Sequence, residues 1–164
     1  RRDLGMDTAL RVAKVIHYDL TAGNASAWHW WLAVSPYDYK DGLIYTDYRR
    51  TGQQNILPSK TLWTLGNFSR YIRPGATRVH TEPLEVEEHL LVSAYIQSRK
   101  PQFVCVVINL STEEAVLKLE VDRRVDSLTP VITSSEYDLA QQPAVKAGKE
   151  MAIPARSVVT LISR

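Results

Sequence analysis

The spacing of apolar residues changes once along the chain, near residue 76. Residues 7–20 and 58–72 carry apolar side chains at helical intervals, and Arg73-Pro74-Gly75 closes the second run, since proline and glycine stop a helix. From Thr77 onward the apolar positions recur with a period of two. A period near 3.6 indicates helices and a period of two indicates strands. The sequence therefore predicts a part with two helices, residues 1–76, and an all-β part, residues 77–164.

Several strands are predicted in the second part, separated by short turn-rich segments. The alternation is clearest over residues 115–121, where one face is entirely apolar and the other is mostly charged. Short strands at this spacing are typical of an antiparallel β-sandwich. The predicted strands are residues 90–96, 103–110, 115–121, 125–133, 151–153 and 157–162.

A tryptophan-rich stretch lies between the two predicted helices, and it holds three of the four tryptophans in the chain. Its position directly after a helix predicts a strand, whose side chains alternate between two faces. The two faces are Trp28, Trp30 and Leu32 against His29, Trp31 and Ala33. Because both faces are bulky and largely apolar, we expect a parallel sheet covered on both sides, as in an α/β barrel or a doubly wound sheet. One strand cannot build such a sheet, so its other strands, against which the helices would pack, are expected before Arg1.

Two interpretations of this aromatic stretch are open. Tryptophan often goes to hydrophobic cores, and core packing alone is the simpler interpretation. The run is followed by Tyr37, Tyr39 and Tyr45, however, which is more aromatic surface than one core strand needs. Flat aromatic faces with polar tips suit the C–H faces and hydroxyls of sugars, and α/β folds bind ligands at the carboxyl ends of their strands. A sugar-binding platform is therefore the second interpretation.

Composition and charge narrow the function classes. The formal charge of +2 and the lack of a basic run argue against nucleic-acid binding, and no apolar run is long enough to span a membrane. Cys105 is the single cysteine, so no disulfide forms within the chain, and the four histidines lack metal-ligand spacing. We therefore expect no metal site and no cofactor. The 164 residues open on Arg1 without a starting methionine or signal segment, and we expect a piece of a longer protein.

Several stretches of the first part form a recognisable set. They are residues 13–20, 24–31, 38–45 and 59–75, followed by Arg78-Val79. Together they closely resemble the carboxyl-terminal part of glycoside hydrolase family 30, and the nearest likeness within that family is to the endo-β-1,6-galactanase group. The resemblance is dense over residues 1–80. Beyond them it is looser and rests on Val92-Ser93-Ala94-Tyr95 and on residues 154–161 as the closing strand.

The resemblance implies a TIM (β/α)8 barrel fused to a β-sandwich side domain. Residues 1–76 would supply the last βα unit of the barrel, as a helix, strand eight, a loop and helix eight. Residues 77–164 would form the antiparallel sandwich. The resemblance also implies a retaining mechanism, in which two glutamates about 5 Å apart flank the cleaved bond. Those glutamates belong to the fourth and seventh barrel strands, and the first glutamate here is Glu82, so we expect no catalytic residue in this chain.

What carries over to this chain is the substrate side of the site. Trp30 matches the strand-eight tryptophan that floors the subsite next to the cleaved bond, and Trp28 shares its face. His29 and Trp31 lie on the opposite face and are predicted to be core residues. The predicted substrate-binding residues are Trp30, Trp28, Tyr37 and Tyr39.

The sequence thus predicts the carboxyl-terminal part of a retaining hydrolase of a β-linked polysaccharide, with β-1,6-galactan as the first choice of substrate. One alternative is a noncatalytic carbohydrate-binding or structural β-sandwich domain. Another is the same fold acting on xylan, β-1,6-glucan or glucosylceramide. The expected partner is a polysaccharide or oligosaccharide, with no nucleic acid and no membrane span. The resemblance implies a full-length enzyme that is monomeric and extracellular or periplasmic, and we expect these 164 residues alone to be inactive.

Overall fold

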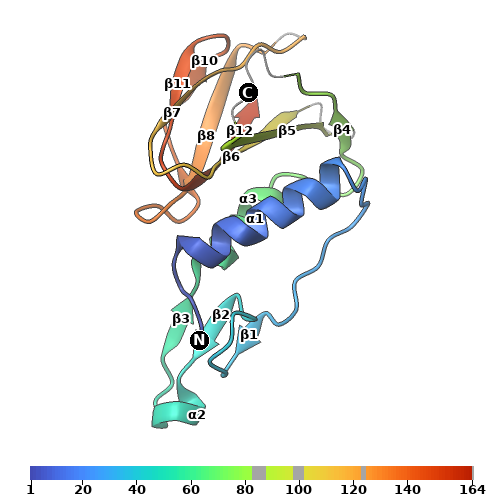
Figure 1. The fold of residues 1–164 in the computed structure, drawn as a ribbon. Helices are drawn as coiled ribbons and strands as arrows, with labels where there is room; N and C mark the ends of the chain where they lie inside the picture. The colour runs from blue at the N-terminus through green and yellow to red at the C-terminus, as the bar shows by residue number, and fades with distance from the viewer. Residues whose placement is uncertain (83–87, 98–101, 123–124, 164) are drawn as a thin grey trace.

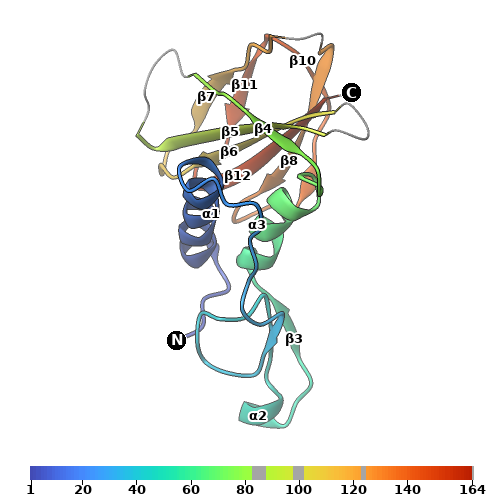
Figure 2. The ribbon, with the colours of Figure 1, turned by 90° about the vertical axis from the view of Figure 1, so that its right-hand side faces the viewer.

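The computed structural model describes residues 1–82, 88–97, 102–122 and 125–163. Its centre is a seven-stranded antiparallel sheet with the order β10-β8-β12-β6-β5-β4, in which β9 pairs with the free part of β8. Helices α1 (Met6–Thr21) and α3 (Lys60–Ser69) lie together against this sheet, and a small lobe hangs from them on the far side (Figures 1 and 2). The strands of the sheet are β4 (Thr77–Val79), β5 (Leu90–Ile96), β6 (Phe103–Asn109), β8 (Ser127–Thr133), β9 (Ala140–Gln141), β10 (Val145–Lys146) and β12 (Ser157–Ser163).

The sheet is buried on both faces. Strand β6 is buried along its whole length, as expected of a central strand whose side chains alternate between two covered faces. Val106 and Ile108 join the cluster formed by the helices, whereas Cys105 and Val107 join the cluster on the opposite face. That opposite face is covered by a separate antiparallel pair, β7 (Ala115–Lys118) and β11 (Glu150–Ile153). The sheet therefore separates two apolar layers.

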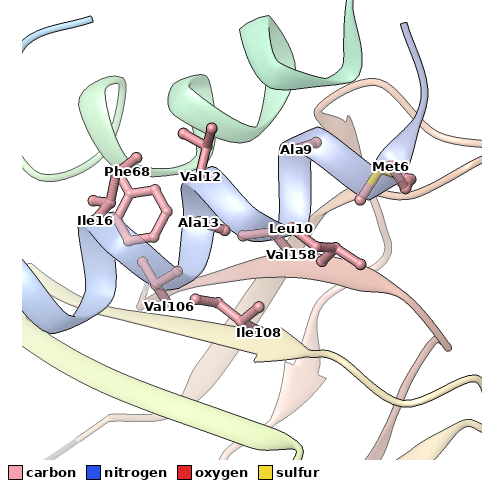
Figure 3. Packing of buried hydrophobic residues seen from close by; sticks show 10 residues of the cluster. All are labelled: Met6, Ala9, Leu10, Val12, Ala13, Ile16, Phe68, Val106, Ile108 and Val158. Atoms are coloured by element: carbon pink, nitrogen blue, oxygen red, sulfur yellow. The ribbon is translucent and has the colours of Figure 1, made fainter. Parts of the chain in front are cut away.

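The helical layer is a dense apolar cluster. One side of α1 is lined by residues at helical spacing, among them Ala9, Ala13 and Ile16, which are almost fully buried. Figure 3 shows these side chains meeting Phe68 from α3 and Val158 from β12. Such spacing puts apolar residues on one stripe of a helix, which must be buried against another element.

Polar side chains also join α3 to the sheet. The Asn67 Nδ2 group donates to the Val131 carbonyl oxygen and to Thr160 Oγ1, both at 3.0 Å. Thr160 Oγ1 in turn donates to the Asn67 carbonyl oxygen at 2.8 Å. All three residues are buried, so these bonds fix the register of α3 on strands β8 and β12.

The two long helices and all the strands predicted after residue 77 are confirmed. The predicted strand at residues 115–121 is shorter, since β7 ends at Lys118, and the predicted strand at 125–133 begins at Ser127. Both helices pack against the antiparallel sheet of the second part. We expected their apolar faces to pack against strands that precede Arg1, and this structure shows a different arrangement. The boundary at residues 76/77 and the barrel origin of the first part stay predictions.

The predicted tryptophan strand is wrong. Residues 28–33, all of which the structure describes, form no strand. Only at the end of this segment do the carbonyl oxygens of Leu32 and Ala33 accept hydrogen bonds, from the N–H groups of Leu43 and Ile44. The chain turns at Leu32, where φ is +69°, and only then forms β1 (Val34–Ser35). A strand is stabilised by its ladder, and the periodic pattern alone does not supply a neighbour to pair with.

Strand β1 begins a small three-stranded sheet in the lobe. It pairs parallel with β2 (Ile44–Thr46), which pairs antiparallel with β3 (Ile56–Pro58). The one-turn helix α2 (Tyr48–Thr51) lies between β2 and β3. Within the described part of the chain, no helix is both long and apolar enough to cross a membrane.

Candidate functional site

Trp28 and Trp30 form a stacked pair beside the helical layer. Their ring centroids are 6.0 Å apart and their planes differ by 22°. Each indole N–H is held: Trp28 Nε1 donates to Asp19 Oδ2 at 2.9 Å, and Trp30 Nε1 donates to the Asp41 carbonyl oxygen at 2.8 Å. Both side chains are half-buried and contact the apolar cluster of α1 and α3. The two rings are therefore fixed in orientation while part of their surface stays open.

His29 and Trp31 lie on the other side of this segment and are exposed, Trp31 to 77%. The prediction that both are core residues is wrong. The alternation itself is correct, because residues 28, 30 and 32 are more buried than 29, 31 and 33. The prediction had the opposite face of the segment covered by the helices, whereas in the structure it is Trp28 and Trp30 that face them.

Tyr37 and Tyr39 form a second aromatic pair in the loop between β1 and β2. Their ring centroids are 6.2 Å apart, with the planes tilted by 34°. Both rings are exposed. The guanidinium of Arg49 lies 5.0 Å from the centroid of Tyr37, and its Nη1 donates to the Tyr37 hydroxyl at 2.9 Å. A cation over an aromatic face is favourable even at an exposed site, so Arg49 helps to hold Tyr37 in place.

The buried side chain of Tyr45 holds this loop in place through hydrogen bonds. It is among the largest fully buried side chains of the described residues. Its hydroxyl donates to the Tyr39 carbonyl oxygen at 2.9 Å and accepts from the Gly42 N–H at 3.1 Å. Burial raises the pKa of Tyr45, which keeps the phenol protonated and able to donate. Gly42 is required for this packing, since a Cβ there would lie 2.7 Å from the Ser35 Cβ.

The structure brings the four predicted substrate-binding residues together as two pairs. Trp30 bonds to Asp41, which belongs to the same loop as Tyr37 and Tyr39, so one loop connects the two pairs. Among the described residues there is no ring contact between a tryptophan of the first pair and a tyrosine of the second. The four rings therefore lie on neighbouring supports and do not form one continuous stack.

Two carboxylates, Asp38 in the loop and Asp47 just after β2, have a structural role. A backbone hydrogen bond from Arg2 lowers the pKa of Asp38, and the Arg2 side chain lowers the pKa of Asp47 through a 2.5 Å ion pair. Both groups are thus ionised near neutral pH and tied to the amino end of the chain. An acid that must donate a proton needs a raised pKa, so neither has the properties of a general acid.

The glutamates that the structure describes lie elsewhere. All of them are exposed, and they belong to the part of the chain after residue 81: Glu82, Glu88, Glu113, Glu114, Glu120, Glu136 and Glu150. Glu85 and Glu87 lie outside the described residues. The described part of the chain also has no group of three or more His, Cys, Asp or Glu residues that could hold a metal ion.

Sequence reasoning missed the groups that orient the aromatic rings. Asp19, nine positions before Trp28, and Arg49, twelve positions after Tyr37, carry no local pattern that links them to those rings. Only the fold brings each of these groups to its partner.

One family of known proteins matches the first part of the chain. The family model described as O-glycosyl hydrolase family 30 matches residues 1–45, the segment that holds α1 and all four predicted substrate-binding residues. The whole chain is similar to solved structures of longer proteins. A conserved exported protein from Bacteroides fragilis has a TM-score of 0.83 and 31% sequence identity, over 96% of this chain and 33% of that one.

Two clostridial enzymes are also similar. A family 30 endoxylanase from Clostridium papyrosolvens C71 has a TM-score of 0.76 and 25% identity, over 100% of this chain and 40% of that one. A family 30, subfamily 8 xylanase from Clostridium acetobutylicum has a TM-score of 0.79 and 24% identity, over 99% of this chain and 40% of that one, and it supports the fold alone. This chain thus spans well under half the length of each. Residues 1–45 carry the sequence features of O-glycosyl hydrolase family 30, and the chain as a whole has the fold of a part of these longer proteins.

Proposed function

We propose that this chain is part of a family 30 glycoside hydrolase that cleaves a β-linked polysaccharide, and that it supplies the aromatic side of the substrate site. The observation that carries the proposal is the stacked pair of Trp28 and Trp30, fixed by two hydrogen bonds inside the segment that matches the family model. Fixed aromatic faces bind sugars without losing side-chain freedom on binding.

In this proposal Trp30 floors the subsite next to the cleaved bond and Trp28 extends it. Tyr37 and Tyr39, exposed on the adjoining loop, contact the polysaccharide further along. The two catalytic glutamates come from a barrel outside this chain, and hydrolysis proceeds with retention, as expected when two carboxyl groups lie about 5 Å apart. The protein carrying this chain acts outside the cytoplasm, in keeping with the exported protein that it resembles.

Two candidate substrates are each favoured by a different observation. The motifs in residues 13–75 resemble the endo-β-1,6-galactanase group, which favours β-1,6-galactan. The similar structure with 25% identity is described as an endoxylanase, which favours xylan. We infer a β-linked backbone in both cases and place β-1,6-galactan first, because the motif likeness covers the aromatic loop itself.

The test is a polysaccharide panel on the full-length protein, comprising β-1,6-galactan, xylan and β-1,6-glucan, with proton NMR of the first-formed product. The proposal expects release of a β-anomer from one member. An initial α-anomer would contradict the retaining mechanism. Binding without hydrolysis would instead support a noncatalytic carbohydrate-binding module.

A pair of variants in one segment tests the aromatic floor. Trp30→Ala should lower kcat/KM at least about tenfold, a change of roughly 1.4 kcal/mol in transition-state binding. Trp31→Ala is the matched control, since it removes an indole of the same segment that is 77% exposed and outside the stacked pair. Trp30→Phe keeps an aromatic ring and most of the packing, and it replaces Trp30→Ala in the kinetic comparison if the alanine variant folds poorly. Equal kinetics for the folded Trp30 and Trp31 variants would remove Trp30 from the site.

A further inference from the structure

A second polar surface lies on α1, away from the aromatic pairs. An open groove of about 310 Å³ is lined by Asp7, Leu10, Arg11, Lys14, Leu110 and Arg156. Leu10, which is buried beside Val158 in Figure 3, and the half-buried Leu110 are its apolar lining. Three cations and one carboxylate surround them, so the groove combines an apolar surface with an excess of positive charge.

The charges on the two sides of the groove are not equivalent. Arg156 forms an ion pair with Asp7, which ties the turn before β12 to the first turn of α1. Arg11 and Lys14 are exposed, and among the described residues neither forms an ion pair. The N–H groups of these two side chains therefore face solvent and can bind a ligand. They lie next to the guanidinium of Arg156, which is already held by Asp7.

Arg156 is held in place by its backbone as well. Its φ is +47°, a conformation that side-chain-bearing residues seldom adopt. Its N–H donates to the Ser111 carbonyl oxygen at 2.9 Å, which fixes the turn to the loop after β6. The guanidinium is thus presented to α1 by a defined turn.

An aromatic ring continues the same face of the helix. Tyr18 is 46% exposed, and Lys14 Nζ lies 6.0 Å from the centroid of its ring. Asp7, Arg11, Lys14 and Tyr18 are spaced by four, three and four residues, which places them on one helix face. At 1.5 Å per residue this stripe extends roughly 16 Å along α1. Cations next to an apolar patch and an exposed ring match a carboxylate-bearing sugar chain, whose carboxylates would meet Arg11 and Lys14 while one sugar ring lies on Tyr18.

We propose that this face of α1 is a second glycan-binding surface, distinct from the aromatic pairs, and that it takes an acidic oligosaccharide through the carboxylates of its sugars. The proposal does not depend on the hydrolase assignment. An enzyme or a noncatalytic module would both use such a surface to hold acidic polysaccharide.

The test is isothermal titration calorimetry of the protein with trigalacturonic acid, and with maltotriose as an uncharged sugar of the same length. The wild type should bind the acidic sugar saturably and the neutral one at least about tenfold more weakly, the effect of one charge-assisted hydrogen bond. Arg11→Ala with Lys14→Ala should weaken binding of the acidic sugar by about tenfold or more. Both positions are exposed on a helix, where alanine is well tolerated.

The matched control is Lys146→Ala with Lys149→Ala, which removes the same charge from exposed positions near the β10–β11 turn. It should bind the acidic sugar as the wild type does, because these two lysines lie away from α1. No saturable binding by the wild type would overturn the proposal. So would equal losses in the two double variants, or displacement of the sugar by an equal concentration of inorganic sulfate.

Discussion

The hydrogen bonds of Asn67 predict that the helices and the antiparallel sheet unfold as one unit. In Asn67→Ala the Nδ2 donor is lost, and with it the bonds to the Val131 carbonyl oxygen and to Thr160 Oγ1. The site is completely buried, so water cannot replace them. If the first part of the chain were a separate folding unit, the same change would disturb the helices alone.

The size of the effect follows from the bonds. Each buried hydrogen bond contributes about 1 kcal/mol, so losing both costs about 2 kcal/mol. The missing side chain leaves a small cavity that adds to this cost. Against it, Asn67 Oδ1 is buried without a partner among the described residues, and its removal relieves a cost of similar size. We therefore expect Asn67→Ala to lower the free energy of unfolding by about 2 kcal/mol.

A double-mutant cycle with Thr160→Val isolates the bond between the two side chains. Valine keeps the shape of threonine but cannot bond to Asn67, so this variant should lose about 1–2 kcal/mol. The bond between Nδ2 and Oγ1 is lost in both single variants, and the double variant should therefore be about 1 kcal/mol more stable than the sum of the single effects predicts. Ser69→Ala is the control, since Ser69 is exposed on the same helix, and it should change stability by less than about 0.5 kcal/mol.

Two signals report on the two layers in denaturant unfolding. All four tryptophans precede residue 77, so their fluorescence follows the helices and the lobe, whereas far-ultraviolet circular dichroism also follows the sheet. We expect coincident midpoints in the wild type, and a shift of both midpoints together in Asn67→Ala. A fluorescence midpoint that falls while the circular dichroism midpoint stays would refute the reasoning.

Two further predictions concern single sites. Gly42→Ala should lower the free energy of unfolding by about 1–3 kcal/mol, because its Cβ would lie 2.7 Å from the Ser35 Cβ and 3.1 Å from the Ile44 carbonyl oxygen. Gly5→Ala, whose Cβ would meet only Asp3 Oδ1 at 3.3 Å, is the control in the same unfolding experiment, and equal effects would contradict the close packing around Gly42. The Cys105 thiol should not react with a disulfide reagent at pH 8 in the folded protein, because complete burial raises its pKa to about 12, and it should react once denaturant is added. Rapid labelling of the native protein would show that β6 opens.

The elements that the sequence predicts well are those whose signal is local. Helix α1 and strands β5, β6 and β12 each carry a full period of apolar positions within their own length, and this pattern needs no knowledge of neighbours. Strands β9 and β10, with two residues each, are too short to show a period. They form because β8 offers free backbone groups beside them.

The candidate site was predictable only in part, for a related reason. Alternation shows that Trp28 and Trp30 share a face, and the structure agrees. It cannot show which neighbour that face meets, because the direction depends on where α1 and α3 pack. The aromatic residues could be named from the sequence, whereas their partners Asp19, Asp41 and Arg49 could not.

His17 gives a last prediction, on the pH dependence of stability. It is 7% exposed, and its Nδ1 has no hydrogen-bond partner among the described residues. Burial lowers the pKa of His17 from its ordinary value of 6.5. Between the lowered value and 6.5 the unfolded chain binds more protons than the folded one, so stability rises with pH through this window and is lost as the pH falls below 6.5.

The experiment compares the free energy of unfolding at pH 7.5 and pH 5.0. Carboxylates with lowered pKa, such as Asp3 and Asp47, titrate below their ordinary value of 3.8 and so stay ionised over this range. The wild type should be less stable at pH 5.0, and His17→Leu, which cannot bind a proton, should lose most of that difference. His89→Gln removes an exposed histidine and should keep it. A pH dependence that survives unchanged in His17→Leu would show that the buried imidazole is not its source.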